Sequence, residues 1–320
     1  DLVRSRGLGD VYKRQDLVDS KGNKFQLRGI STHGINWDVG SPYVNKKAFK
    51  TLRDDWGVNA IRLAMYTEEY NGYCSGGSQA KLRKLVDKGV GYATDLGMYA
   101  IIDWHILSDG NPNKNKSQAK KFFTTMAKKY KNNKNVIYEI CNEPNGCSWK
   151  EIKSYATDII KTIRKYDKKA VIIVGTPTWS QLGTDGTSNE VADSPIKGYK
   201  NIMYSLHFYA SEWAHNEYLP AKVAYARKKK LPIIVSEFGL SPASGDGAIN
   251  KASADKWMKL LNKYNISYFC WSLSNKNESA SLLKPSTKKI SGWKSGDLST
   301  AGKYIKKKYL ARKKALGKKA

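Results

Sequence analysis

Short apolar runs recur along the chain at intervals of about 30 to 40 residues. They are rich in β-branched residues and are bounded by polar or glycine-containing segments, which is typical of strands buried on both faces. Longer stretches with the period of an amphipathic helix separate most of them, near 78–96, 115–131, 150–166 and 252–264. The predicted strands cover residues 26–31, 58–63, 98–103, 135–141, 170–175, 201–206, 232–236 and 267–272.

Strands that alternate with helices predict a parallel sheet, because a parallel crossover needs about a dozen residues or more. Eight such units close naturally into a single (β/α)8 TIM barrel, an α/β fold with its active-site groups at the carboxyl ends of the strands. An open doubly wound sheet would instead carry a glycine-rich phosphate turn after its first strand. The segment RGISTHG after the first predicted strand is no such turn, so the pattern favours the barrel.

The two ends of the chain differ from its centre. Residues 1–15 (DLVRSRGLGDVYKRQ) are polar and unpatterned, and they resemble a translated adapter or assembly artefact more than part of a domain. Two short alternating runs around a Lys-Gly-Asn turn then predict an N-terminal β-hairpin that precedes the first barrel strand. We expect one domain over 16–310 and a basic C-terminal tail over 311–320.

The charge of the chain is unusual, with 56 Lys and Arg against 28 Asp and Glu, or +28. Such a balance raises nucleic acid or an anionic surface as a partner. The basic residues are mostly Lys, however, and fall on predicted helix exteriors such as 227–230 and 306–308. No zinc-finger spacing or RNA-binding aromatic pattern accompanies them. The sequence therefore favours a basic but inert surface over nucleic-acid binding, with attraction to anionic polymers as a secondary reading.

Other compositional features narrow the class of protein. No apolar run approaches the roughly 18 residues that span a bilayer, and no secretory signal is visible at the N-terminus. Nine Trp and 20 Tyr are more than a core alone usually needs. Cys141 and Cys270 fall in apolar runs and are expected to be buried thiols, whereas Cys74 and Cys147 lie in glycine-rich loops, where their pairing stays open.

Polar and aromatic side chains gather where the predicted strands end. Two carboxylates, Glu143 and Glu237, finish strands four and seven, and glycoside hydrolysis needs such a pair flanking the scissile bond. A single strand-end Glu is usually solvated or salt-bridged, and a single Trp usually packs in a core, so the argument rests on the whole set at one rim. Its other members are His33, Trp37, Arg62, Tyr66, Asp103, His105, Asn142, Trp179, His207, Tyr209, Trp271, Lys276 and Glu278.

A metal site is the main rival chemistry for this rim. Asp103, His105, His207 and the two Glu residues are all possible ligands. Against a metal, the chain has no His-x-His pair and no HExxH motif, and Arg62 would sit poorly beside a cation. We therefore expect no metal.

Several longer strings in the chain resemble glycoside hydrolase family 5, the cellulase family, and most closely its bacterial endo-β-1,4-glucanases. The resemblance runs in order over about residues 17 to 310, so it is more specific than an isolated NEP motif. The strings are LRGISTHGINW, IRLAMYT, IIDWHILSDGNPN, VIYEICNEPNG, IIVGTPTWSQ, MYSLHFYA and CWSLSNKNESASLLKP.

The resemblance implies a retaining, cofactor-free endoglucanase. Glu143 would be the general acid/base and Glu237 the nucleophile, kept charged by Arg62 and Tyr209. Asn142 would bind the 2-hydroxyl at the −1 subsite. The remaining roles are also carried over from the family: His105, His207 and Trp271 would line that subsite, Trp37, Tyr66, Lys276 and Glu278 would contact the glycone side, His33 would orient Trp37 or a sugar, and Trp179 would face the aglycone side.

The chain departs from the family pattern at two positions. Ser272 stands where many relatives have Asn, which would lose a sugar hydrogen bond, and Phe238 replaces the commoner Trp after the nucleophile, which we interpret as a packing change. A β-mannanase or a mixed-linkage β-glucanase would use the same two Glu residues, and a sugar-binding barrel without catalysis would lose one of them. We expect a β-glucan partner, no nucleic acid, a monomer, and secretion, since a polymer cannot enter cells.

Overall fold

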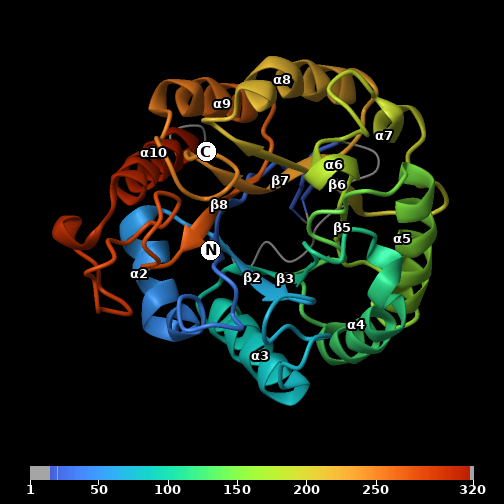
Figure 1. Cartoon of the computed structure of the whole chain (residues 1–320), viewed down its shortest axis with the longest axis horizontal. Helices are drawn as coiled ribbons and strands as arrows, with labels where there is room; N and C mark the ends of the chain where they lie inside the picture. The colour runs from blue at the N-terminus through green and yellow to red at the C-terminus, as the bar shows by residue number, and fades with distance from the viewer. Residues whose placement is uncertain (1–14, 20, 318–320) are drawn as a thin grey trace.

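The computed structural model describes residues 15–19 and 21–317. Within them, parallel strands follow one another around a closed barrel in chain order, and β8 pairs with β1 (Figure 1). This confirms the predicted (β/α)8 barrel. The strands are β1 Arg28–Thr32, β2 Ala60–Tyr66, β3 Tyr99–His105, β4 Val136–Glu139, β5 Ile172–Val174, β6 Ile202–Tyr209, β7 Ile233–Gly239 and β8 Tyr268–Leu273.

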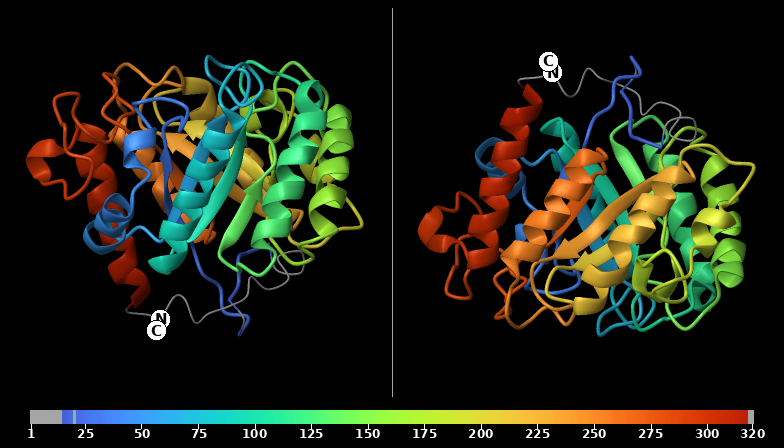
Figure 2. Two further views of the ribbon diagram at one scale, coloured as in Figure 1. Left: turned by 90° about the horizontal axis from the view of Figure 1, so that it is seen from below. Right: turned by 90° about the horizontal axis from the view of Figure 1, so that it is seen from above.

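Helices surround the barrel and bury their apolar faces against the strands (Figures 1 and 2). Several begin at a polar N-cap, such as Asn45 before α2, Ser78 before α3 and Ser148 before α5, whose side chain accepts a backbone N–H of the first turn. The α-helices are α2 Lys46–Trp56, α3 Gln79–Asp95, α4 Lys116–Tyr130, α5 Trp149–Arg164, α6 Pro177–Ser180, α7 Glu190–Asp193, α8 Trp213–Lys228, α9 Lys251–Lys263 and α10 Thr300–Gly317, with 3-10 turns at Ser41–Tyr43, Pro112–Asn115 and Ser295–Asp297.

The predicted hairpin closes the amino-terminal end of the barrel. Val18 and Lys24 form an antiparallel bridge, and the Phe25 N–H donates to the Leu17 carbonyl at 3.0 Å. Regular pairing is limited to this bridge, so the segment is a turn with one rung rather than two full strands. Leu17 and Leu27 join the apolar side chains that fill the lower barrel interior, and the hairpin therefore acts as a plug.

The barrel interior consists of an apolar lower layer and a charged upper layer. Every strand from β2 to β8 contributes an aliphatic or aromatic side chain to the lower layer, and Phe269 of β8 lies directly over Gly29 of β1. A Cβ at Gly29 would come within 2.0 Å of the Phe269 ring, so only glycine fits there. The lower layer contains Leu17, Leu27, Ala60, Tyr99, Ile101, Ile137, Val171, Ile173, Met203, Ile234 and Phe269.

The carboxyl-terminal segment is more regular than expected. The domain was expected to end at 310, whereas α10 continues to Gly317. Ile305 and Tyr309 are fully buried, and the Arg312 Nε–H donates to Gln26 of the hairpin at 2.8 Å. These contacts hold the helix against the barrel where charge alone suggested a tail. The expected non-domain segment 1–15 lies outside the described residues except for Gln15.

Most of the described basic residues lie on the outside of the fold, as the sequence indicated, whereas Arg28 and Arg62 are buried. Lys222 in α8 is the only buried lysine in the part of the chain that the structure describes. None of the described helices combines the length and the apolar character that crossing a membrane requires.

Candidate active site

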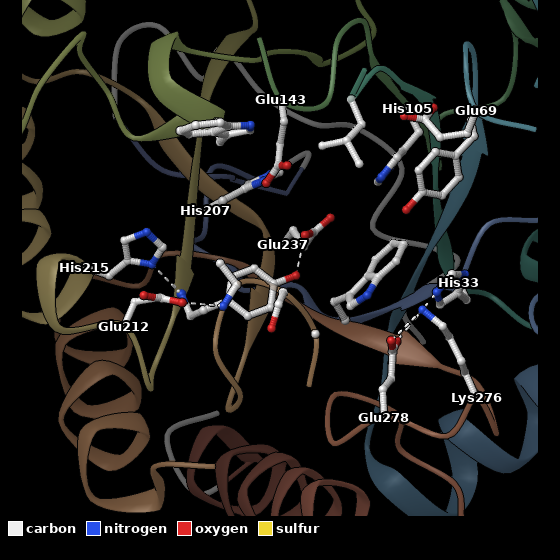
Figure 3. A pocket seen from close by; sticks show the side chains of 18 of the residues that line it. His33, Glu69, His105, Glu143, His207, Glu212, His215, Glu237, Lys276 and Glu278 are labelled. Carbon is white, nitrogen blue, oxygen red and sulfur yellow. Dashed lines mark hydrogen bonds and ion pairs between the residues drawn. The ribbon is translucent and has the colours of Figure 1, made fainter. Parts of the chain in front are cut away.

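A cavity of about 600 Å³ opens at the carboxyl ends of the strands (Figure 3). The strand-end residues singled out from the sequence converge on it. Arg62, Asn142 and Asp103 instead lie buried beneath its floor. The predicted residues that line the cavity are His33, Trp37, Tyr66, His105, Glu143, Trp179, His207, Tyr209, Glu237, Trp271, Lys276 and Glu278.

Two carboxyl groups face each other across the cavity. Glu143 follows β4, and Glu237 lies near the end of β7. One oxygen of Glu143, one oxygen of Glu237 and a ring nitrogen of His207 all lie within 4.8 Å of one another. Retaining glycosidases place their carboxyl groups about 5–5.5 Å apart, and inverting enzymes need a wider gap for a water molecule. The separation of these two oxygens is therefore closer to the retaining arrangement than to the inverting one.

Glu237 is held by two donors. Its Oε2 accepts from Arg62 Nη1 at 2.8 Å, and its Oε1 accepts from the Tyr209 hydroxyl at 2.6 Å. These bonds compensate its negative charge and fix the plane of the carboxylate. Because Tyr209 lies on β6, the neighbouring strand, the barrel itself sets this geometry.

Arg62 is fully buried and serves several acceptors at once. Its Nε and Nη2 form a bidentate pair with Glu139 at 2.8 and 3.2 Å, and Nη2 lies 3.1 Å from Asp103. Burial lowers the pKa of Arg62, but the carboxylates of Asp103, Glu139 and Glu237 outweigh burial and raise it well above its ordinary value. Arg62 is therefore a permanent cation that makes the buried carboxylates tolerable.

Glu143 has the opposite character from Glu237. Burial raises its pKa to about 8, and the charges of Asp103 and Glu139 act in the same direction against that of Arg62. Its Oε1 lies 2.8 Å from Nδ1 of His207. At neutral pH this carboxyl group carries a proton.

The hydrogen-bond chain beneath His207 fixes its tautomer. The Ser236 hydroxyl donates to Glu139 at 2.6 Å, so its oxygen accepts from Nε2–H of His207 at 2.9 Å. Burial lowers the pKa of His207 to about 4, so the ring is neutral and has no second proton. Nδ1 is then an acceptor, and the protonated Glu143 is the group that donates to it.

Asn142 is oriented inward in this structure. Its Oδ1 accepts from Arg62 Nη2 at 2.5 Å, and its Nδ2 donates to the Ile106 carbonyl and to Nε2 of His105. His105 in turn donates from Nδ1 to Asp103 at 2.6 Å, and burial lowers its pKa to about 3. To bind a sugar hydroxyl, as its family role implies, Asn142 would have to exchange one of these contacts.

One side of the cavity is a cluster of aromatic rings. Trp37 and Tyr66 lie with ring centroids 4.5 Å apart, and His33 packs 5.8 Å from Trp37 and 5.0 Å from Trp271. The Trp37 Nε1–H donates to the Tyr70 carbonyl, which fixes the ring. His33 therefore does contact Trp37, as expected from the sequence.

Two charged side chains complete this side of the cavity. Lys276 Nζ lies 2.6 Å from Glu278 Oε2, and His33 Nε2 lies 3.7 Å from Glu278 Oε1. Burial and the charge of Lys276 lower the pKa of His33 to about 3, so the ring is neutral. The side thus offers flat rings together with donors and acceptors, which suits a hydroxylated ring compound.

Trp179 forms the opposite side and is 44% exposed. It is presented by consecutive left-handed residues, with φ of 57°, 53° and 61° at Thr178, Trp179 and Ser180. The Trp179 N–H donates to the Pro144 carbonyl, and the Ser180 hydroxyl donates to the Asn142 carbonyl. These bonds to the segment around Glu143 hold a strained turn that aims an apolar ring into the opening.

The two positions that departed from the family pattern lie outside the cavity wall. Phe238 is buried and stacks on Phe208 with ring centroids 5.2 Å apart, which is the packing role expected of it. Ser272 is fully buried and does not line the cavity.

A cation would compete poorly for the central groups. Glu143, His207 and Glu237 offer atoms within reach of one ion, but both oxygens of Glu237 already accept from Arg62 and Tyr209. The proton on Glu143 would also have to leave. The donor set therefore suits proton transfer and nucleophilic attack better than metal coordination.

Some residues of the site were not identified from the sequence. Glu139 and Ser236 organise the buried network, and Glu139 was detectable as a lone charge inside an apolar strand. His215 lines the cavity and accepts the Tyr209 N–H on Nδ1 at 2.9 Å. The other lining residues that were missed are Glu69, Leu107, Gln181, Glu212, Ala243, Ser244 and Gly245.

The four cysteines are free thiols in this structure. Cys141 and Cys270 are buried, as expected from their apolar surroundings. Cys74 and Cys147 are half-buried, and burial raises the pKa of Cys74 to about 12 and that of Cys147 to about 11. At neutral pH these thiols are protonated and unreactive.

Comparison with known proteins gives consistent matches over most of the chain. The family model Cellulase (glycosyl hydrolase family 5) matches residues 18–277. Endoglucanase A of Butyrivibrio fibrisolvens is 45% identical over 293 residues, and an endoglucanase of Clostridium saccharobutylicum is 47% identical over 295 residues. The alignments cover 90% and 91% of this chain but 66% and 62% of those proteins. The chain thus spans less than two thirds of the length of these curated relatives.

A solved structure extends the likeness to three dimensions. A single-residue variant of the catalytic domain of the Thermobifida fusca endoglucanase Cel5A, in complex with cellotetraose, matches with a TM-score of 0.87 and 36% identity. The match covers 97% of this chain and 99% of that domain. The similarity therefore extends over nearly the whole of both chains.

Proposed function

Because the chain belongs to glycosyl hydrolase family 5, the cellulase family, we propose that it is a retaining endo-β-1,4-glucanase. Its substrate would be the internal β-1,4-glucosidic bonds of cellulose or a related β-glucan. One observation carries the proposal: a protonated carboxyl, Glu143, faces a charge-compensated carboxylate, Glu237, with oxygens within 4.8 Å. Two carboxyl groups in different protonation states are what the double displacement requires.

In the first step, Glu237 attacks the anomeric carbon of the sugar bound between the two carboxyl groups. The bond from that carbon to the glycosidic oxygen breaks, and Glu143 gives its proton to the departing oxygen. A covalent glycosyl ester forms on Glu237, and the chain on the aglycone side leaves with a free 4-hydroxyl. Glu143 is then ionised, and Nδ1 of His207 no longer receives a hydrogen bond from it.

In the second step, a water molecule attacks the anomeric carbon of the ester. Glu143 accepts the proton of the water, the ester bond breaks, and Glu237 returns as a carboxylate held by Arg62 and Tyr209. Two inversions give a product of retained β configuration. The carboxyl groups end in their starting protonation states.

The pH dependence follows from the protonation of the two groups. Activity requires Glu143 with its proton, and the pKa of about 8 places the alkaline limb of kcat/KM near that pH. We expect a bell-shaped profile that extends into the weakly alkaline range.

The walls of the cavity support a β-glucan as the substrate. Trp37, Tyr66 and Trp271 offer flat apolar faces on the glycone side, and Trp179 does so on the aglycone side. Lys276 and Glu278 add a donor and an acceptor for hydroxyl groups. The solved complex of the Thermobifida fusca variant with cellotetraose supports a β-1,4-glucan as the substrate. β-Mannan and mixed-linkage β-glucan are the alternative substrates for the same machinery.

The remaining expectations belong to the same proposal. The reaction needs neither a metal nor another cofactor, since proton transfer and nucleophilic attack are supplied by side chains. A polymeric substrate implies that the enzyme acts outside the cell. We propose a monomer whose basic surface has no nucleic-acid role, which a retention assay on DNA at low salt would test.

The test is release of reducing sugar from carboxymethylcellulose, mixed-linkage β-glucan and galactomannan in parallel, with Glu237→Gln as the control. We expect release from carboxymethylcellulose that the variant abolishes, and proton NMR should show the β-anomer as the first product. Release chiefly from galactomannan would move the substrate to mannan. An α-anomer as first product, or no release from any polymer, would overturn the proposed mechanism or activity.

A further inference from the structure

Exposed aromatic side chains gather at the mouth of the barrel. Among the described residues, the large aromatic side chains that are exposed are Tyr70, Trp179, Trp213 and Tyr218. Tyr70 follows β2, Trp179 follows β5, and Trp213 and Tyr218 follow β6. All of them therefore lie on segments that leave the carboxyl ends of strands, at the end of the barrel where the cavity opens. The hydrophobic effect does not explain this placement, because rings that stay exposed to water contribute no burial free energy to folding.

Trp213 and Tyr218 form a pair in the first two turns of α8. Trp213 is 69% exposed, Tyr218 is 38% exposed, and their rings meet edge to face with centroids 5.9 Å apart. The pair adjoins the cavity, since Glu212 and His215 on the same turn both line it (Figure 3). Neither ring was among the candidate residues identified from the sequence, and neither takes part in the proposed catalytic steps.

The pair is attached to the aglycone side of the cavity. The backbone of Gly186 packs against the Tyr218 ring, where an added Cβ would come within 2.8 Å. Lys222, buried one turn further along α8, donates to the carbonyls of Gln181 and Asp185. These contacts tie α8 to the loop that directly follows Trp179, so the two aromatic sites lie on connected segments of the same side of the cavity.

We propose that Trp213 and Tyr218 form an outer sugar-binding platform on the aglycone side, beyond Trp179, for a long β-glucan chain. The inference rests on the proposed glucanase function and deepens it. The pair would hold glucose units remote from the scissile bond, so it would act on polymers and long oligomers and not on short substrates. Trp and Tyr suit this role because each presents a flat apolar face together with a polar edge.

A glucan chain fits this surface better than a second protein domain does. The patch consists of two rings and is continuous with the cavity through Glu212 and His215. A stable protein interface requires about 800 Å² on each partner, far more than two rings provide. A neutral polymer also has no charge requirement, so the platform can operate on a strongly basic protein.

The test compares long and short substrates in Trp213→Ala and in the double variant Trp213→Ala/Tyr218→Ala. The quantity measured is the ratio of kcat/KM for mixed-linkage or carboxymethylated glucan to kcat/KM for an aryl β-cellobioside, which has no glucose on the aglycone side. We expect this ratio to fall about threefold to tenfold, the loss of one aromatic contact. Trp213→Phe should restore most of the ratio. Leu310→Ala, an exposed apolar side chain on α10, is the matched control and should leave the ratio as in the wild type.

A binding measurement separates the platform from catalysis. In a Glu237→Gln background, electrophoretic retardation by hydroxyethylcellulose should weaken when Trp213→Ala is added. An unchanged ratio together with unchanged retardation would overturn the platform, as would an equal fall for both substrate lengths, which would indicate damage to the cavity. If the wild type cleaves no β-1,4-glucan at all, the proposed function fails rather than the platform.

Discussion

The same strands build the lower and upper halves of the barrel interior, but the lower half is filled by apolar side chains and the upper half by charged ones. On β3, Ile101 belongs to the dry lower layer, and Asp103, two residues later, belongs to the charged upper layer. On β4, Ile137 and Glu139 repeat the same change. Because side chains two apart on a strand share a face, a single step along each strand converts an apolar core into the network around Arg62.

This difference separates the sources of stability and of chemistry. The lower layer gains free energy from burial of apolar surface in close packing. The upper layer places Arg62 among Asp103, Glu139 and Glu237, an arrangement that pays desolvation for every charge and recovers it only through exact pairing. Stability should therefore depend on the lower layer, and activity on the upper one.

The strongest test of the comparison removes the central charge of the upper layer. Arg62→Met leaves three buried carboxyl groups without their cation, and breaking a buried pair costs about 3–5 kcal/mol of unfolding free energy. Turnover should fall by more than about a thousandfold, since Glu237 loses one of its two donors and its orientation. Urea unfolding and kinetics on carboxymethylcellulose measure both. Wild-type turnover in this variant would show that the network is not needed for catalysis.

The next largest effect is expected from loss of Glu143, the proposed general acid/base. Glu143→Ala should lower turnover on polymer by about 10²–10⁴-fold, the usual contribution of general acid–base catalysis. An aryl β-cellobioside with a 2,4-dinitrophenyl leaving group needs no proton, so its first step should persist and show a burst of phenolate. Added azide should accelerate the second step, because it attacks without a general base. Equal losses on both substrates would contradict the role given to Glu143.

A substitution in the lower layer should have the opposite effect, a loss of stability without a loss of kcat. Ile101→Ala removes a fully buried side chain and leaves a cavity, at a cost of about 2–5 kcal/mol in unfolding free energy. The kcat at a temperature well below the melting transition should match that of the wild type. Ile101 lies beside Arg62 on the neighbouring strand but takes no part in the ion pairs of the upper layer. A marked fall in kcat without a fall in stability would mean that the two layers are coupled.

Stability should depend on pH through Glu143. Its pKa is about 8 in the folded protein and about 4.5 ordinarily, so the folded state favours the neutral form. This contribution is complete below about pH 4.5 and is lost as the pH rises through 8, by a few kcal/mol in order of magnitude. Glu143→Gln should therefore lose less unfolding free energy than the wild type between pH 5 and pH 9. If the unfolding free energies of the variant and the wild type, measured with urea, fell equally between pH 5 and pH 9, the raised pKa of Glu143 would be contradicted.

The smallest expected effect concerns the tautomer of His207. Ser236→Ala removes the acceptor for Nε2–H, so the proton can move to Nδ1 and donate to ionised Glu143. The alkaline limb of the kcat/KM profile should then shift to lower pH, and turnover at pH 7 should fall about tenfold. Ser205→Ala, which removes only the outer partner of Ser236, is the matched control. An unchanged alkaline limb would show that Ser236 does not influence the protonation of Glu143 through His207.

Much of the fold was predictable because parallel barrel strands read as apolar runs at regular spacing. The predicted helices correspond to α3, α4, α5 and α9 with ends within two residues. The extension of α10 was not predictable, since Arg312 bonds to Gln26, a residue far away in the sequence. Long-range contacts of this kind leave no local pattern.

The site was predictable at its rim and less so beneath it. Strand ends can be located from the sequence, so Glu143 and Glu237 were found at once. A run that is buried on both faces shows no alternation, and the direction of each side chain is therefore hidden. For this reason Glu139 and Ser236 were missed, and Asn142 was assigned to substrate although its amide is directed into the network.

The plugging hairpin and the end of α10 meet at the face opposite the cavity, where Arg312 joins Gln26 (Figure 2). The described chain thus enters and leaves the barrel on the side away from the cavity. If the protein were attached to a solid support through either end of the described chain, the cavity would face away from the support. Immobilised protein should then retain its access to long chains, whereas coupling through scattered surface lysines would orient the molecules at random.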